Sequence, residues 1–592
     1  MYSIIRCAAG FLLLAAVIST PSPGGVVFLD ESFDYDRDHP AAGEWLGNIV
    51  LGEGPPAWAA LTIGTDDAGV WTTILTAMTA RAVNTPCGEV TIEGSSVAFA
   101  LRSMSAHFSG RVSADGQRLS GKIVFDVEDM GEGTFEFART PLATDLPEPL
   151  AFSGKLATPG GKLAMTMVFA RTPGGNWVGV LDVPAQGLSG LPFTRVSRDD
   201  DTITATLEIP GSGVQVTGQI VENEQRLTGT FNQGPFALEI DFPRDNDYAV
   251  PTINRPQHPE PPYPYTMRDV TVEHPDGHTL AGTLTIPAGA GPFAAAVMIT
   301  GSGPQDRDET LFGHKPFHVI ADYLARNGIA VLRCDDRGTG ESGGSFEGAT
   351  TADFATDTLA AMEYLATVEG IDARRVGLIG HSEGGVIAPM VAGLTDDVDF
   401  MVLLAGTGVP GDELLLVQAE LIAKASGANE MMIAATRAQQ QGLFALIRQG
   451  LDEQQLQREL RPILEAQLEM AGLEDESLHD AVEAQIAQVT SPWMRYFVTY
   501  DPRPALTRVA CPVFALNGTL DLQVYHDQNL PEIQKAIKTG GGDVTIRRYQ
   551  GLNHLFQPAE TGLILEYATI EITFDEAVLR DIVAWILENA GS

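Results

Sequence analysis

The stretch Arg375–Ala388, which reads RVGLIGHSEGGVIA, decides how this chain folds. It joins a short apolar run to the pentapeptide GHSEG and then to a small-residue pattern typical of a helix. A strand that enters a helix through such a tight turn holds Ser382 in a strained backbone conformation and lifts its side chain clear of the sheet. Small residues on both sides let the strand and the helix approach closely. The predicted turn comprises Gly380, His381, Ser382, Glu383 and Gly384.

The turn also predicts a site for a developing negative charge. The backbone N–H of Glu383 would lie at the helix N-terminus and point toward an oxygen atom at the centre that Ser382 attacks. A second donor should come from the glycine-rich stretch 300–307, and we expect the N–H of Ser302 to fill this role, with Gly303 as the next candidate. The pentapeptide alone also fits a glycine-rich loop with an ordinary serine, because the chain has 62 glycines.

A serine hydroxyl needs a base to take its proton, and the base needs a carboxylate that fixes its tautomer. In a strand–turn–helix site of this kind both partners follow the serine in the chain. His554 comes shortly after an apolar run that ends near Tyr549, whereas His526 falls inside a predicted helix. His554 is therefore the predicted base.

Two aspartates compete for the orienting role. Asp521 follows the apolar run 513–517, at the sheet edge where the active groups of open α/β sheets gather. Asp501 precedes that run, and we expect it to cap or brace the chain there. Asp521 is therefore the predicted carboxylate. Asp335 and Asp336 follow another apolar run, and we interpret them as a charged turn that braces the site, because no histidine or thiolate ligand lies near them in the sequence.

Composition limits the class of protein. A chain of 592 residues is too long for a single core, so we expect two or three domains. Hydrophobic residues make up 44% and charged residues 19%, which is typical of a globular protein. The formal net charge of −40 makes nucleic acid and anionic membrane surfaces poor partners.

The first 19 residues have the pattern of a secretory signal peptide, with one positive charge before a short apolar run and small residues after it. Neither this run nor any later segment is long enough to span a bilayer. We therefore expect a periplasmic or extracellular bacterial protein. The remaining cysteines, Cys87, Cys334 and Cys511, are too few and too scattered for a disulfide framework.

Residues from about 30 to 242 alternate apolar and polar positions in short runs, which indicates antiparallel β structure. The segment 109–121 returns as 217–229, so the region predicts two tandem β modules, at 28–142 and 148–243, or else two halves of one β unit. Neither module has a cluster that suggests a metal or catalytic site. Four tryptophans could bind sugar rings, although a core position is the commoner role for them. They are Trp45, Trp58, Trp71 and Trp177.

A proline-rich linker at 244–265 marks the clearest domain boundary. After it, at 266–592, apolar runs alternate with helical patterns, which predicts a doubly wound, mostly parallel α/β sheet. One crossover, at about 410–500, is much longer than the others and has helical periodicity throughout. We interpret it as a helical cap over the sheet that excludes water and shapes an acyl pocket; a packing appendage is the alternative.

Five motifs between about 260 and 592 together resemble the bacterial α/β-hydrolase carboxylesterases of the GHSEGG type. The resemblance implies hydrolysis of short-chain acyl esters by Ser382, Asp521 and His554, with no metal and no cofactor. The segment 152–242 resembles the small β domain often found ahead of such hydrolases, although here that domain occurs twice. The motifs are Thr300–Asp308, Asp335–Ser342, Gly380–Gly385, Asn517–Asp521 and Asn553-His554.

Three functions remain open from the sequence. The leading one is a secreted serine carboxylesterase acting on a small-molecule or glycan-linked acyl ester. A serine exopeptidase of the prolyl-oligopeptidase kind shares the serine motif, but its propeller repeats at about 40–50 residues, whereas the repeat here is about a hundred residues. The third is a polysaccharide deacetylase-type esterase that its β modules hold on a surface. Acyl length, the alcohol portion and the oligomeric state are not revealed.

Overall fold

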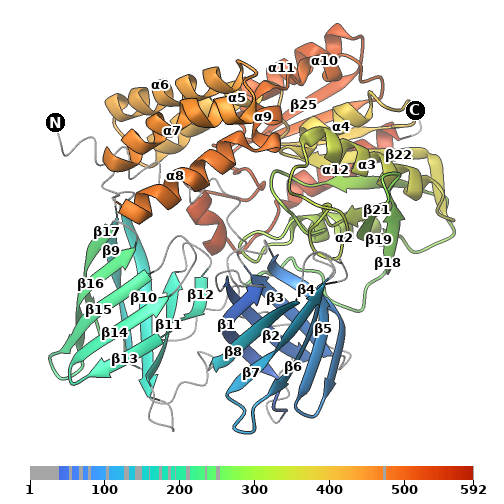
Figure 1. Cartoon of the computed structure of the whole chain (residues 1–592). Helices are drawn as coiled ribbons and strands as arrows, with labels where there is room; N and C mark the ends of the chain where they lie inside the picture. The colour runs from blue at the N-terminus through green and yellow to red at the C-terminus, as the bar shows by residue number, and fades with distance from the viewer. Residues whose placement is uncertain are drawn as a thin grey trace. The chain divides into compact units, whose positions relative to one another are not determined.

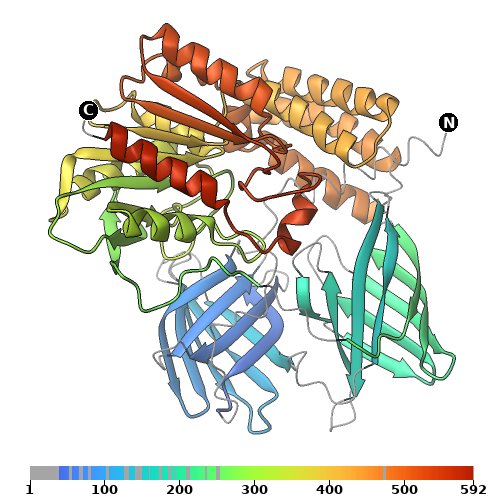
Figure 2. The ribbon, with the colours of Figure 1, turned by 180° about the vertical axis from the view of Figure 1, so that it is seen from behind.

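The computed structural model describes residues 39–590, with gaps at 52–56, 66–70, 78–81, 102–105, 126–131, 141–149, 159–160, 172–176, 184–187, 194, 208–213, 234–235, 249–253 and 471–474. The chain divides into a β unit, residues 1–253 with the short segment 469–481, and an α/β unit, residues 254–468 and 482–592 (Figures 1 and 2). The predicted signal peptide, 1–19, lies outside the described residues. Within the described part of the chain, no helix combines the length and apolarity needed to cross a membrane.

The first half of the β unit is a closed barrel in which each strand pairs with the next and β1 pairs antiparallel with β8. Its interior is filled by apolar side chains, among them Trp45, Phe99 and Phe137. Alternate residues of each strand point inward, which is the reason for the period of two in the sequence. The strands are β1 Gly43–Leu51, β2 Ala57–Thr65, β3 Trp71–Ala77, β4 Ala82–Glu93, β5 Ser96–Leu101, β6 Ala106–Val112, β7 Arg118–Phe125 and β8 Glu132–Thr140.

The second half consists of a four-stranded sheet, in the order β12-β11-β10-β9, and a five-stranded sheet that runs from β13 to β17. Both sheets contribute to one core, with Phe152 and Phe169 from the first sheet and Ile203 and Phe231 from the second. The strands are β9 Leu150–Thr158, β10 Gly161–Arg171, β11 Trp177–Val183, β12 Leu188–Pro192, β13 Arg195–Asp199, β14 Thr202–Leu207, β15 Val214–Val221, β16 Arg226–Gln233 and β17 Phe236–Pro243.

The sequence repeat corresponds to one hairpin in each half. Gly110 pairs with Gly121 across β6 and β7, and Gly218 pairs with Gly229 across β15 and β16. A Cβ on Gly229 would meet the backbone carbonyl of Thr217 and would lie 2.6 Å from the Cα of Gly218. A Cβ on Gly121 would likewise lie 2.5 Å from the Cα of Gly110. The repeated glycines therefore permit a close cross-strand approach.

Replacing Gly229 by Ala tests this constraint. Because backbone atoms oppose the new methyl group, we expect a loss of about 1–3 kcal/mol in unfolding free energy. Calorimetric unfolding of the full chain measures it, with the exposed neighbour Thr230→Ala as the matched control. Equal stability of the two variants would show that the close approach imposes no constraint.

The described tryptophan side chains belong to cores. Trp45 is fully buried, and its indole N–H donates to the carbonyl of Ala41 at 3.0 Å. Trp71 and Trp177 are half-buried and pack against the cores of their own halves. The side chain of Trp58 lies outside the described residues. These contacts favour the core interpretation over a sugar-binding platform.

The α/β unit contains an eight-stranded sheet in the order β18-β19-β21-β20-β22-β23-β24-β25. The pairs β18–β19 and β19–β21 are antiparallel and all the others are parallel, so the predicted fold class is confirmed. The strands are β18 Thr266–Glu273, β19 Thr279–Ile286, β20 Phe293–Ile299, β21 Ile329–Cys334, β22 Ile371–His381, β23 Met401–Leu404, β24 Val513–Gly518 and β25 Val544–Tyr549.

Helices cover both faces of this sheet, as Figures 1 and 2 show. Successive residues of β20 alternate between two cores: Ala295 and Val297 pack on one side, Ala296 and Met298 on the other. Because both faces are buried, the strands are apolar at nearly every position. Helices α3 Thr351–Ala366, α4 Gly384–Val391 and α11 His526–Thr539 contribute to the first core, and α2 Pro316–Arg326 and α12 Glu576–Asn589 to the second.

The crossover between β23 and β24 is helical, as its periodicity predicts. Leu456, Leu460 and Leu464, at helical spacing, are buried, whereas Met431 and Ile463 are exposed. The helices are α5 Gly411–Ala425, α6 Glu430–Ile447, α7 Glu453–Met470, α8 Asp475–Thr490 and α9 Pro492–Thr499, and the short α10 Arg503–Leu506 leads into β24.

The described part of the proline-rich segment, from residue 254 on, forms hydrogen bonds with later parts of the chain. Arg255 donates to the carbonyls of Ile570 and Phe312, both at 2.8 Å. The side chain of Gln257 accepts from the N–H of Thr573 at 2.7 Å. Residues 254–265 are thus hydrogen-bonded to the rest of the α/β unit. Proline prevents regular structure in this segment, but the side chains between the prolines remain available for hydrogen bonds.

Candidate active site

The strand–turn–helix at Ser382 has a strained geometry. Ser382 lies between β22 and α4 with a φ of 53°, in the left-handed region that serine seldom adopts. Its N–H donates to the carbonyl of Leu404 at 2.9 Å, which fixes the turn against β23. A Cβ on Gly380 would collide with the carbonyl of Gly384, and one on Gly384 with the carbonyl of Ile299. These glycines are required for space rather than for an unusual backbone angle.

Asp521 and His554 lie together at the carboxyl ends of β24 and β25. The Nδ1–H of His554 donates to Oδ2 of Asp521 at 2.8 Å, and both side chains are buried. The other oxygen of Asp521 accepts the N–H groups of Gln523 and Val524, each at 2.8 Å. The carboxylate is therefore fixed by its own turn, and it leaves Nε2 of His554 as the basic nitrogen.

Two contacts place His554 beside the turn of Ser382. The Nε2–H of His381 donates to the carbonyl of His554 at 3.1 Å. The two imidazole rings are tilted with their centroids 4.7 Å apart. The structure thus brings the loop after β25 against the residue that precedes Ser382.

The competing candidates lie elsewhere. His526 is the first residue of α11, where its Nδ1 accepts from Arg548 at 3.2 Å. Asp501 accepts the backbone N–H of Arg503 at 3.0 Å and its Nε–H at 2.8 Å, and Arg503 is the first residue of α10. Asp501 thus braces the chain that returns from the insertion, and these bonds lower the pKa of its carboxyl group despite the opposing effect of burial.

Exchanging each aspartate for asparagine separates these roles. Asp521→Asn would donate an amide hydrogen to Nδ1 of His554 and stabilise the wrong tautomer, so we expect turnover of an ester to fall by about 10⁴-fold. Asp501→Asn should change turnover by no more than about threefold, because its partners lie outside the site. Steady-state kinetics of both variants measure the difference, and a larger loss at Asp501 would reverse the assignment.

The loop after β20 lies against the serine turn. A Cβ on Gly301 would lie 3.3 Å from the Cβ of Ser382, so the loop backbone runs directly beside this residue. The hydroxyl of Ser302 is hydrogen-bonded to the carboxylate of Glu383. Gly303 has a φ of 93°, in the left-handed region, and provides a bend at the end of the segment that runs beside Ser382. The structure therefore brings together the two segments from which backbone donors were predicted.

The side chain of Glu383 holds three elements together. Its Oε1 accepts from the hydroxyl of Thr351 at 2.7 Å and from the indole N–H of Trp493 at 2.9 Å. Thr351 begins α3, and Trp493 belongs to α9 of the helical insertion. Burial raises the pKa of Glu383, and the hydrogen bonds from Thr351, Trp493 and Ser302 oppose that rise. The insertion thus contacts the residue next to Ser382.

The charged turn after β21 braces the loop of Ser302. Asp336 accepts from the hydroxyl of Thr300 at 2.7 Å and from the N–H of Gln305 at 2.9 Å. Asp335 forms a bidentate pair with Arg307, at 3.0 and 2.7 Å. Burial raises the pKa of Asp336 well above its usual value, while the bond from Thr300 opposes this rise. These contacts agree with the predicted bracing role.

One buried acid that the sequence did not single out also contacts the site. Glu309 has a φ of 52°, and its Oε1 accepts the backbone N–H of Gly301 at 2.7 Å. The same oxygen lies 2.8 Å from Nδ1 of His381. Glu309 follows the glycine-rich motif without any spacing signal, so only the folded loop reveals its partners.

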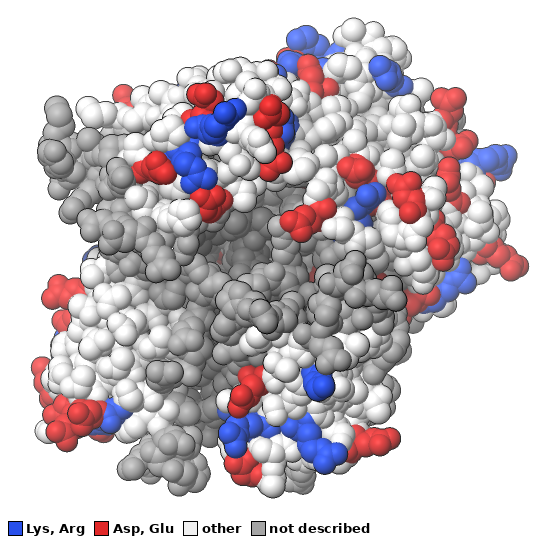
Figure 3. Space-filling model, viewed as in Figure 1, with Lys and Arg blue, Asp and Glu red and all other residues white. Residues whose placement is uncertain are grey.

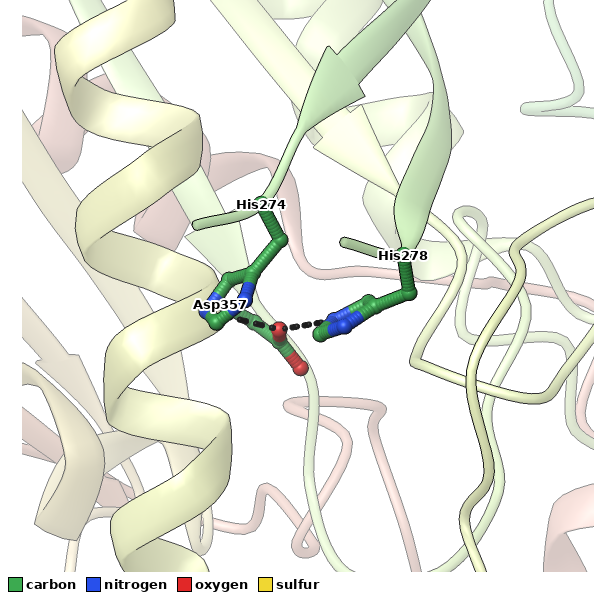
Figure 4. A group of neighbouring side chains, drawn as sticks. All are labelled: His274, His278 and Asp357. Atoms are coloured by element: carbon green, nitrogen blue, oxygen red, sulfur yellow. Dashed lines mark hydrogen bonds and ion pairs between the residues drawn. The ribbon is translucent and has the colours of Figure 1, made fainter. Parts of the chain in front are cut away.

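A second cluster, His274, His278 and Asp357, contains three possible metal ligands (Figure 4). Nε2 of His278 lies 2.9 Å from Oδ1 of Asp357, and the two imidazoles stack with centroids 4.2 Å apart. Nδ1 of His274 accepts the N–H of Asp276 at 3.1 Å, which leaves the proton on Nε2. Arg337 also pairs with both carboxylate oxygens, at 2.6 and 2.9 Å.

These bonds fit a polar network better than a metal centre. A protonated Nε2 on His274 has no lone pair for a metal. The guanidinium of Arg337 already balances the charge of Asp357. The network ties the turn between β18 and β19 to α3.

Comparison with known proteins relates the α/β unit to hydrolases. Residues 276–547 match the family model of X-Pro dipeptidyl-peptidase (S15 family). Esterase EstD of Thermotoga maritima is 31% identical over 195 residues, which are 33% of this chain and 42% of that protein. The chain therefore matches less than half the length of this curated relative.

Solved structures to which the chain is similar include an esterase and a ferulic acid complex. The esterase Pf2001 of Pyrococcus furiosus is 14% identical, with 57% of this chain and 98% of that chain covered and a TM-score of 0.35. Est1E of Butyrivibrio proteoclasticus, with ferulic acid bound, is 15% identical, with 55% of this chain and 100% of that chain covered and a TM-score of 0.32.

Proposed function

We propose that this protein is a serine hydrolase that cleaves carboxylic ester bonds, as the resemblance of its motifs to the GHSEGG-type carboxylesterases implies. The observation that supports this most directly is the buried pair of His554 and Asp521 beside the strained turn of Ser382. A left-handed serine before a helix, next to an imidazole of fixed tautomer, is the arrangement that acyl transfer requires.

In the proposed reaction, His554 takes the proton of Ser382 as the hydroxyl attacks the acyl carbonyl. The backbone N–H of Glu383 and a donor from the loop at Ser302 or Gly303 stabilise the oxyanion. His554 then protonates the departing alcohol, and an acyl-enzyme remains. Water, activated by the same histidine, attacks the acyl-enzyme and releases the acid. Asp521 stabilises the imidazolium that forms at each step.

Two substrate classes fit the domain. The similarity to esterase EstD favours an ester, as does the resemblance in motifs. The match to the X-Pro dipeptidyl-peptidase family favours a peptide with proline near its N-terminus, and this is the second candidate. Both substrates react through the same acyl-enzyme, so the site chemistry alone does not separate them. We propose a short-chain ester as the preferred substrate.

A comparison of p-nitrophenyl butyrate with X-prolyl p-nitroanilides decides between these classes. We expect kcat/KM to be higher for the ester, and faster hydrolysis of the anilide would support the peptidase. Ser382→Ala should lower turnover by about 10⁶-fold, because the nucleophile and its base act as one unit. A fluorophosphonate probe should label wild type at Ser382, and turnover near that of wild type in Ser382→Ala would reject the assignment.

We also propose that the protein is exported and that the β unit supports the hydrolase rather than catalysing a reaction. The support for export is the N-terminal pattern of the sequence. On the face shown in Figure 3, Lys and Arg side chains of the described residues lie among Asp and Glu rather than in one patch, which fits the expectation that polyanions are not partners.

Intact mass measurement of the protein recovered from a bacterial periplasm or medium tests export. We expect the mature chain to begin near residue 20, since small residues follow the apolar run there. A full-length protein retained in the cytoplasm would contradict the proposal. Binding assays of the full chain with acylated polysaccharide, compared with deacylated polysaccharide, test the deacetylase-type alternative in which the β unit holds a glycan.

A further inference from the structure

Glu309 and His381 form a buried pair that touches three parts of the active site. Both residues are less than a tenth exposed. Oε1 of Glu309 accepts the N–H of Gly301 at 2.7 Å, in the loop that lies against Ser382. His381 immediately precedes Ser382, and its Nε2 lies 3.1 Å from the carbonyl of His554. The pair therefore connects the proposed oxyanion loop, the nucleophile turn and the loop of the base.

The hydrogen bonds fix where the protons lie. A backbone carbonyl can only accept, so Nε2 of His381 must carry a hydrogen. Oε1 of Glu309 lies 2.8 Å from Nδ1 of the same ring and also accepts from Gly301. One more proton therefore lies in the bond between Glu309 and His381. Burial lowers the pKa of His381, but the charge and the hydrogen bond of Glu309 outweigh burial and raise it, which places that proton on the imidazole.

We propose that Glu309 and His381 act as a positioning pair, in which the imidazole of His381, held by Glu309, sets the position of His554. This inference rests on the proposed serine-hydrolase function and deepens it. The two residues touch no reacting atom in the proposed mechanism; they act through Gly301 and His554. The loop of Glu309 and the turn of His381 are far apart in the chain, so the pair fixes a geometry that neither segment sets alone.

Two single variants test the pair. Glu309→Gln keeps an acceptor for Gly301 but removes the charge, and His381→Gln keeps an N–H donor for the carbonyl of His554. We expect each to lower kcat for p-nitrophenyl butyrate by about 10- to 100-fold with KM changed by less than about threefold, because the reacting groups are misplaced while the substrate is still bound.

The double variant and a matched control complete the experiment. Because the two residues act as one unit, Glu309→Gln with His381→Gln should be no slower than the worse single variant. Asp306→Asn is the control: this acid belongs to the same loop and accepts the N–H groups of Asp308 and Thr310 at 2.9 and 3.0 Å, which an amide oxygen can replace. It should keep the kcat of wild type.

Wild-type kcat in either single variant, or losses that add in the double variant, would overturn the positioning role. Thermal unfolding of every variant identifies one that fails to fold, in which case Glu309→Asp, which keeps the charge, should restore part of the activity that Glu309→Gln loses. Failure of this inference is distinguishable from failure of the proposed function. If Ser382→Ala removes turnover while both single variants behave as wild type, only the positioning role is wrong.

Discussion

The close approach of β22 and α4 around a left-handed Ser382 is the constraint on which the site depends. A backbone in this region is costly for serine, and it persists only where the surroundings determine it completely. Here the N–H of Ser382 donates to the carbonyl of Leu404, which fixes the turn. The carbonyls beside Gly380 and Gly384 leave no room for a Cβ atom at either glycine. The result is a side chain raised above the sheet at the first turn of a helix.

The remaining groups reach this point because parallel strands end at one edge. Asp521 and His554 follow β24 and β25, so their mutual position is set by strand register and by two short turns. The carboxylates around them are buried but satisfied: Asp336, Glu383 and Glu309 each accept from backbone or side-chain donors of other segments. Buried acids that are bonded in this way hold loops in a single arrangement, because breaking any one bond leaves a charge without a partner.

Much of this arrangement could be predicted from the sequence. Apolar runs, glycines and the chain order of Ser382, Asp521 and His554 depend on local patterns, and the α/β sheet follows from them. Glu309 and Trp493 could not be predicted, because their roles come from partners far away in the chain and no spacing rule marks them. The repeat at Gly110 and Gly218 predicted two β modules but not that one copy closes into a barrel while the other forms two sheets, since closure depends on how all the strands pair.

The helical insertion leaves the sheet after β23 and returns to it before β24, two strands that are hydrogen-bonded neighbours. Its departure and arrival points therefore remain side by side whatever length of chain lies between them. During evolution this segment can be exchanged by recombination or lengthened without a change in the register of any strand. Among the contacts described for Glu383, the hydrogen bond from the indole of Trp493 is the one that a replacement segment would have to reproduce. The catalytic residues on the strands and the helical segment inserted between two of those strands can therefore change independently of each other.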